Sequence, residues 1–431
     1  MNLSSWVRSL LTRKWVQELL AYSGQGYILS FINILVSILL VRFFGREEYG
    51  MYGLVFAVSG VITNVCGLGV FPLAMTRWLK DQRPEEERET RAYFSTGLTL
   101  ALTLSVFALL ALFFWYPFSF VVYSLVATVS WFFYNLVPFS YISFVKERRL
   151  KGFLGTETIV QLIKTGVPLG VLLCFSFTMT WFFLGLSLSM VVTTFWLGWL
   201  ATQKRVDLSL FPRRLTYAFL RSKQLFIRGV GIAFESGAAT FYASLLFIAA
   251  SQLGGLGLTA DIKVLSGYVA TLTFVSTPFS KWVTNHLPQR LGNSTRPWQD
   301  MMKWNGIGFV QGLAVYVVGL ILAPLVFPLV YGPMYAHLWV EYAKAGLWLV
   351  VCGGAVGVSV FSRLQGMGWT FGLLSLTNIL LGILLVYLLN VDTVQGLALF
   401  YGLWAIPGTL GSYVLSYLYI RRHQRLAASV M

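Results

Sequence analysis

Twelve stretches of mostly apolar residues recur along the chain, and each is about long enough to cross a bilayer as a helix. They are too long and too uniformly apolar for the alternating strands of an outer-membrane barrel. A helix, in contrast, satisfies its own backbone hydrogen bonds inside lipid. We place them at about residues 20–42, 51–75, 93–115, 118–141, 153–175, 179–200, 225–249, 259–283, 305–329, 343–365, 369–390 and 396–420.

These stretches predict an all-α polytopic membrane protein with about 12 transmembrane helices. The composition agrees, because 57% of the residues are hydrophobic and only 11% are charged, against about 25% charged residues in a soluble domain. The longest polar gap, residues 201–224, separates six stretches from six, which predicts two six-helix lobes in the same orientation.

The domain boundaries follow from this division. We expect an N-terminal helix lying in the membrane interface over residues 1–19, because Trp6 and Trp15 lie on an apolar face opposite Arg8 and Arg13. The remaining units are predicted as an N-lobe at 20–200, a cytoplasmic linker at 201–224, a C-lobe at 225–420 and a cytoplasmic tail at 421–431.

The net charge of +16 is concentrated on one side of this predicted topology. With the N-terminus inside, the outer loops hold only Arg42 and Arg46 as basic residues, beside Glu47, Glu48 and Asp392. This is the positive-inside bias, and it places both termini in the cytoplasm. Nucleic-acid binding is not needed to explain the charge, so we expect no nucleic-acid partner.

Sequence patterns for cofactor and metal chemistry are absent. There is no GxxxxGK[ST] phosphate loop, the three histidines have no metal-ligand spacing, and the three cysteines all lie in apolar stretches. We therefore expect no cofactor, no metal site and no catalytic residue.

Ionisable residues inside the apolar stretches are the strongest candidates for a site. The stretch LFIRGVGIAFESGAATFYASLLF contains Arg228 and Glu235, although a charge near the bilayer centre costs at least about 2.5 to 3.5 kcal/mol. The two residues lie on one helix face, about 10 Å apart along the axis. Glu157 and Lys164 repeat this spacing in the fifth stretch, and Lys263 lies in the eighth. Such residues are expected to face the protein interior or a wet cavity.

The segment ILLVRFFGREEYGMYGLVFAVSGVITNVCGLGVFPLAMTRWL, residues 38–79, resembles the opening of the polysaccharide transporter family. These are the Wzx-type oligosaccharide flippases of the multidrug/oligosaccharidyl-lipid/polysaccharide (MOP) superfamily. The features that carry the resemblance are an arginine and phenylalanine before Gly45, an acidic pair, Tyr49, Gly50, Tyr52, Gly67–Leu68–Gly69 and Arg77. Near the end of the ninth stretch, the matching residues are Tyr331, Gly332 and Tyr335.

We interpret the first motif as architectural. Gly45 and Gly50 bracket a predicted helix-to-helix turn, where glycine tolerates unusual backbone angles. Tyr49 and Tyr52 suit the membrane–water boundary and are not expected to bind substrate.

The resemblance implies a flippase that moves a polyprenyl-diphosphate-linked oligosaccharide across a bacterial inner membrane by alternating access. Membrane lipids, a polymerase and other glycan-assembly proteins are the implied partners. Two alternatives stay open: a cation-coupled multidrug or lipid exporter of the same superfamily, and a membrane glycan polymerase or ligase.

The intramembrane charges then allow two interpretations. In the first, they form buried pairs such as Lys164 with Glu235, and these pairs only fix helix packing. In the second, basic residues bind an anionic headgroup while Glu235 or Glu157 exchanges a coupling ion. The resemblance supports Arg228, Glu235 and Lys263 more than the fifth-stretch pair. The complete set of predicted substrate-binding residues is Arg228, Lys263, Lys164, Gln25, Asn33, Asn64, Tyr242 and Tyr268.

Overall fold

The computed structural model covers the 431-residue chain. It describes residues 31–67, 69–78, 84–141, 150–203, 244–273, 297–358, 368–388, 393–403 and 405–430, together with Ile28, Phe144, Gly229 and Phe361. Every regular element in this part of the chain is a helix, and eight of its helices are long and apolar enough to cross a membrane. The predicted all-α, membrane-spanning fold class is confirmed.

The first group of helices comes from the N-terminal half. After a shorter apolar helix at Phe31–Phe43 follow α3 (Arg46–Cys66), α4 (Val70–Trp78), α5 (Pro84–Leu112), α6 (Phe118–Ser140), α8 (Leu150–Cys174) and α9 (Met179–Thr202). Within the group α3 packs against α5 and α6, and α9 packs against α6 and α8. Two of these helices are preceded by a residue with extended backbone, Pro117 before α6 and Thr178 before α9.

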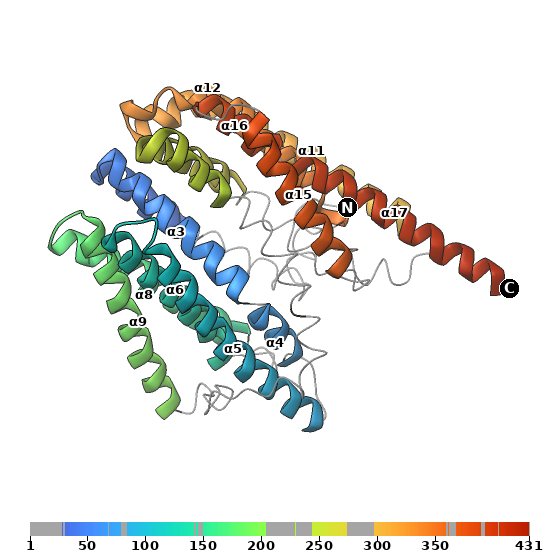
Figure 1. Cartoon of the computed structure of the whole chain (residues 1–431), viewed down its shortest axis with the longest axis horizontal. Coiled ribbons are helices and arrows are strands. Elements are labelled where there is room, and N and C mark those ends of the chain that lie inside the picture. The colour runs from blue at the N-terminus through green and yellow to red at the C-terminus, as the bar shows by residue number, and fades with distance from the viewer. Residues whose placement is uncertain are drawn as a thin grey trace, which may run out of the picture.

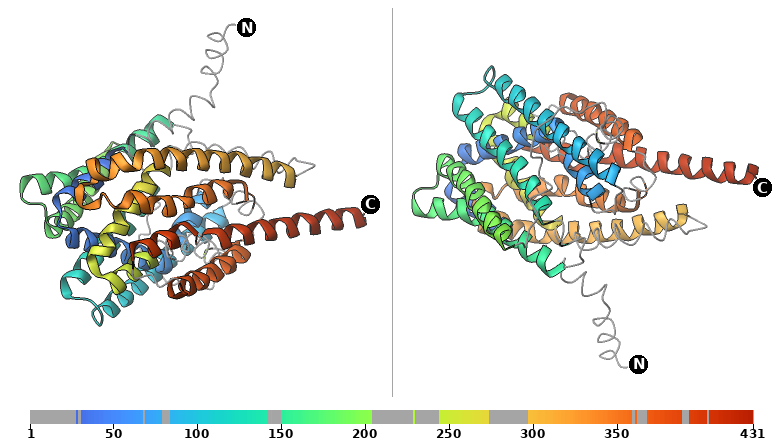
Figure 2. Two further views of the ribbon diagram at one scale, coloured as in Figure 1. Left: turned by 90° about the horizontal axis from the view of Figure 1, so that it is seen from above. Right: turned by 90° about the horizontal axis from the view of Figure 1, so that it is seen from below.

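The second group comes from the C-terminal half and is less regular. It contains α11 (Pro297–Val326), the π-helix η1 (Phe327–Tyr331), the 3-10 turn η2 (Pro333–Tyr335), α12 (Leu338–Ala345), α13 (Leu347–Gly354), α15 (Gly368–Leu388), α16 (Val394–Leu403) and α17 (Ala405–Val430). Here α11 packs against α13, α12 against α16, and α15 against α17. Both views in Figure 2 show α17 running out of the body, with the C-terminus at its far end.

The predicted tenth span, residues 343–365, is not one continuous helix. Its outer part is divided between α12 and α13, and a further turn follows Gly354. The break accompanies a very close helix contact, since a Cβ on Gly308 of α11 would lie 2.2 Å from the carbonyl oxygen of Gly353. Small residues allow this approach, which is a common way for membrane helices to associate.

The helical segment Ser244–Thr273 lies at the seam between the two groups. It turns at Gly255, whose φ of +70° is a backbone conformation that glycine adopts without steric cost. Beyond this turn, Leu256 and Ala260 contact α3, while Tyr268 contacts Gly319 of α11. The main hydrophobic core runs through this segment and joins residues from both groups.

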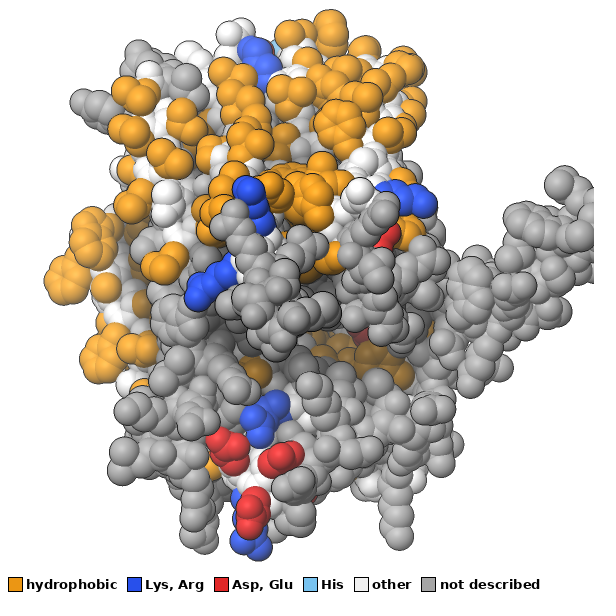
Figure 3. Space-filling view, turned by 90° about the vertical axis from the view of Figure 1, so that its right-hand side faces the viewer, with side chains coloured by type: hydrophobic (Ala, Val, Ile, Leu, Met, Phe, Trp, Pro, Cys, Tyr) orange, Lys and Arg blue, Asp and Glu red, His pale blue; other side chains and the backbone are white. Residues whose placement is uncertain are grey.

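The two groups meet at one end of the molecule. In Figure 1 the blue-to-green helices and the orange-to-red helices come together where α3 begins, and they diverge toward the ends labelled α5 and α17. The end where the two groups meet is the predicted outer end of the molecule. Figure 3 views the molecule from the opposite end, where apolar side chains cover much of the described flanks. Exposed Phe107, Phe195 and Ile321 are typical of helices that face lipid.

Candidate functional site

A cavity of about 320 Å³ lies between the N-terminal helices and the Ser244–Thr273 segment. Its size is in the range of sites that hold small molecules. Both hydroxyl-bearing and aromatic side chains contribute to its wall, together with two lysines. The lining residues are Asn33, Val36, Ser37, Tyr52, Phe56, Ser59, Gly60, Ala127, Ser130, Trp131, Lys164, Thr165, Pro168, Phe182, Leu186 and Lys263.

Lys263 enters the cavity from the segment at the seam. Its ammonium group lies over two rings, 5.6 Å from the centroid of Tyr52 and 5.5 Å from that of Phe247. These distances are within the range of a cation–π contact, which partly replaces the water lost on burial. The aliphatic part of Lys263 packs against Gly53, where a Cβ would lie 3.3 Å from the lysine Cγ. The glycine therefore allows this side chain to lie close along α3.

Lys164 reaches the same cavity from α8. Its Nζ lies 4.9 Å from the ring centroid of Tyr134, and Tyr134 is held in turn by a 2.7 Å hydrogen bond between its hydroxyl and that of Ser189. The neighbouring Thr165 and Pro168 line the cavity as well.

Among the described residues that line the cavity, two side chains are basic and none is acidic. A buried charge without a nearby counter-ion is costly unless a ligand or water compensates it. The cavity is therefore suited to an anionic group with an apolar or ring-bearing part, because the lysines would attract the charge and the aromatic rings would pack against the remainder.

The predicted site residues separate into two sets in the structure. Asn33, Lys164 and Lys263 line the cavity together. The other described residues, Asn64, Tyr268 and Glu157, are not among its lining residues.

Hydrogen bonds to backbone carbonyls account for two of these outlying residues. The Asn64 amide donates to the carbonyl of Gly60 in its own helix, at 2.8 Å. The buried Tyr268 hydroxyl donates to the Gly319 carbonyl at 2.9 Å. Glu157, seven residues before Lys164 in α8, lies near Tyr141. Four further predicted residues lie outside the described part of the chain: Gln25, Arg228, Glu235 and Tyr242.

Three residues of the first motif differ in the structure from their predicted roles. Tyr52 lines the cavity rather than a membrane boundary, and Tyr49 is buried in the core. Gly50 does not lie in a turn. It lies within α3, and a Cβ there would be 1.9 Å from the carbonyl oxygen of Leu256. The glycine is thus needed for close helix approach and not for an unusual backbone angle.

Aromatic residues form a large part of the cavity wall, and the sequence did not single them out. Phe56, Trp131 and Phe182 line the cavity with Tyr52, but apolar spans contain many aromatic residues that face lipid. The one available signal is the four-residue spacing of Tyr52 and Phe56, which places both on one face of α3.

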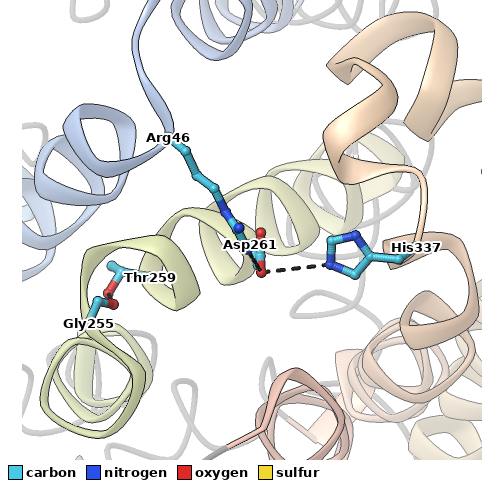
Figure 4. Close-up of polar contacts among 5 residues, drawn as sticks. All are labelled: Arg46, Gly255, Thr259, Asp261 and His337. Carbon is cyan, nitrogen blue, oxygen red and sulfur yellow. Dashed lines mark hydrogen bonds and ion pairs between the residues drawn. The ribbon is translucent and has the colours of Figure 1, made fainter.

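A second polar cluster lies at the end where the two groups of helices meet. Arg46 at the start of α3 donates to Asp261 with an Nη2–Oδ2 distance of 2.5 Å. His337, which precedes α12, points at the same carboxylate, and its Nε2 lies 3.7 Å from Oδ2. Figure 4 shows the three side chains converging from three separate elements. Nearby, Arg42 donates to the carbonyls of Leu329 and Val330.

Solved structures of multidrug transporters have this fold over almost the whole chain. An outward-facing structure of a multidrug resistance MATE family transporter of the MOP superfamily aligns with a TM-score of 0.63 and 16% identity, covering 96% of this chain and 98% of that chain. An inward-facing structure described in the same words aligns with a TM-score of 0.61 and 16% identity, covering 93% and 95%. A ligand complex of the MATE multidrug transporter DinF-BH aligns with a TM-score of 0.60 and 15% identity, covering 95% and 96%.

The fold of this chain is therefore the one seen in these MATE transporters. No protein-family model and no curated protein matches the sequence.

Proposed function

We propose that the protein is a membrane transporter that moves an amphiphilic substrate by alternating access, as a small-molecule or lipid exporter of the MATE kind. The cavity at the seam is the observation that carries this proposal. Lys164 lines it from α8 in the first helix group, and Lys263 lines it from the Ser244–Thr273 segment at the seam. A relative movement of the two helix groups would therefore change the access of these lysines to each membrane face. The likeness to both an inward-facing and an outward-facing transporter supports such a movement.

Flipping of a polyprenyl-diphosphate-linked oligosaccharide is the second candidate. The pair of cavity lysines favours it, because fixed cations in a low-dielectric site bind a diphosphate strongly. The similar structures named above are multidrug transporters, so they support the exporter over the flippase. They are transporters and not enzymes, and they lend nothing to a polymerase or ligase. Both remaining candidates take an anionic, partly apolar substrate in the same cavity. The family resemblance implies a bacterial inner membrane as the location.

Transport by purified protein in liposomes would separate these functions. We would measure the initial uptake rate of an anionic amphiphilic dye, a cationic dye and a polyprenyl diphosphate sugar, with and without an imposed proton or sodium gradient. We expect transport of the anionic compounds. Uptake of the free dye supports the exporter, whereas movement of the polyprenyl compound alone supports the flippase. Absence of transport for all three under every gradient would refute the proposal.

Removal of one cavity charge provides the site-specific arm of this experiment. We expect Lys263→Gln to lower the rate at subsaturating anionic substrate about tenfold, equivalent to roughly 1.4 kcal/mol of binding free energy. Lys303→Gln is the matched control, since Lys303 is an exposed residue on α11 that does not line the cavity. Equal rates for the two variants would show that Lys263 has no role in binding.

A further inference from the structure

The contact at the predicted outer end has the features of a reversible closure. Arg46 belongs to the first helix group, whereas Asp261 lies on the seam segment and His337 precedes α12 in the second group. One carboxylate oxygen therefore joins three parts of the chain that are far apart in sequence. A contact that served only to build one lobe would not need a partner from each side of the seam.

The cavity lies directly behind this contact. Along α3, Arg46 is followed by the close approach of Gly50 to Leu256, and then by Tyr52 in the cavity wall. On the facing segment, Lys263 follows Asp261 by two residues and lines the same cavity. The elements that hold the ion pair are thus the elements that bound the cavity on this side.

Burial differs strongly among the three charged groups. The Asp261 side chain is 2% exposed, whereas those of Arg46 and His337 are 45% and 50% exposed. In addition, Oδ1 of Asp261 is buried and has no hydrogen-bond partner among the described residues. A buried carboxylate needs its cations to remain charged. If the two helix groups part at this end, water can replace both cations as partners of the Asp261 carboxylate. Opening and closing would then exchange water for Arg46 and His337 at this carboxylate.

We propose that Arg46, Asp261 and His337 form an ionic lock that closes the cavity at the predicted outer end, with Asp261 as the residue on which both cations depend. This inference rests on the proposed transport function, and it concerns control of access rather than substrate binding. Arg42, bonded to the carbonyls of η1, and the Gly50 contact support the closed arrangement from either side.

Cysteine accessibility would test the lock without requiring a known substrate. The three native cysteines, all free among the described residues, are replaced by alanine, and Ser37→Cys is introduced as a reporter in the cavity wall. Labelling with a membrane-impermeant maleimide is then followed in vesicles of both orientations. We expect slow labelling from the outer side in this background and at least about fivefold faster labelling after Asp261→Asn or Arg46→Gln.

A double-mutant cycle distinguishes a lock from general loosening. Because the two residues act through one contact, the Arg46→Gln/Asp261→Asn double variant should label no faster than the faster single variant. His337→Gln, at a half-exposed position expected to tolerate the change, should accelerate labelling by a smaller factor. Arg91→Gln is the control, since it removes an ion pair with Glu87 on α5, far from the seam.

The outcomes separate this inference from the proposed function. Unchanged outer labelling in His337→Gln and in any folded Arg46 or Asp261 variant would overturn the lock, even if the protein transports substrate. Additive effects in the double variant would also overturn it. Faster labelling as expected, with no transport of any compound, would leave the lock in place and refute the transporter proposal.

Discussion

Glu48 illustrates how single polar residues at the predicted outer end stabilise the helix termini. Its Oε1 accepts a hydrogen bond of 2.5 Å from the backbone N–H of Met179, the first residue of α9. A carboxylate at this position satisfies a free N–H and interacts favourably with the helix dipole. The adjacent Glu47 is exposed and lies in the first turn of α3.

We expect Glu48→Gln to reduce stability by roughly 0.3 to 1 kcal/mol, because the amide can still accept a hydrogen bond but carries no charge. The free energy of unfolding would be measured in detergent by thermal or denaturant unfolding. Glu47→Gln is the matched control and should have the smaller effect. A larger loss for Glu47→Gln would show that the α9 terminus is not the relevant partner.

Two glycines of the same motif should respond differently to a methyl group. Gly45 has an ordinary φ of −62° and open space around a Cβ, so Gly45→Ala should be nearly neutral. At Gly50 the same change would place the methyl group against the Leu256 carbonyl, and overpacking of this kind costs about 1 to 3 kcal/mol. Unfolding measurements on both variants check this, and equal stabilities would contradict the helix contact.

At the scale of elements, the broken helix around α13 depends on a side chain from its neighbour. The buried Asn305 of α11 accepts hydrogen bonds from the backbone N–H groups of Gly357 and Val358, at 2.7 and 3.2 Å. These groups lie just after the interruption that follows Gly354. Inside a membrane, such groups require a partner from the protein, so Asn305 compensates for the missing helical bonds.

Asn305→Ala should therefore destabilise the protein by about 1 to 3 kcal/mol, because it leaves two buried donors without an acceptor. Asn64→Ala offers a comparison, since that amide donates to a carbonyl of its own helix and its loss should have a smaller effect. Stability would be measured as the midpoint of thermal unfolding in the same detergent. Similar shifts for both variants would argue against the bridging role of Asn305.

At the scale of the whole molecule, the orientation in the membrane comes from charge rather than from packing. The basic surplus predicts that the end with α17 is cytoplasmic and that the end with the Arg46 cluster is outside. A reporter enzyme that is active only in the cytoplasm should work when fused after Met431. The same reporter inserted between α5 and α6 should be inactive, and the opposite pattern would reverse the assigned sides.

The helical class and the number of apolar stretches follow from the sequence, because lipid leaves a spanning segment little choice but to satisfy its own backbone. The sequence predicts three of the cavity residues, Lys164, Lys263 and Asn33, because a charged or polar side chain within an apolar stretch costs free energy in lipid. The structure brings these three residues together. Aromatic lining residues such as Tyr52 and Phe56 were missed, since a ring that faces lipid and a ring that faces a cavity look alike in sequence.

The sequence alone predicts which segments enter the membrane, since transfer into lipid depends on each segment's own side chains. Only the tertiary structure decided which charges meet. Arg46 was expected in an outer loop, and Asp261 belongs to the predicted stretch 259–283, yet they share one contact with His337. Such pairing depends on how the two helix groups pack, because positions 46, 261 and 337 are far apart in sequence and no local pattern links them.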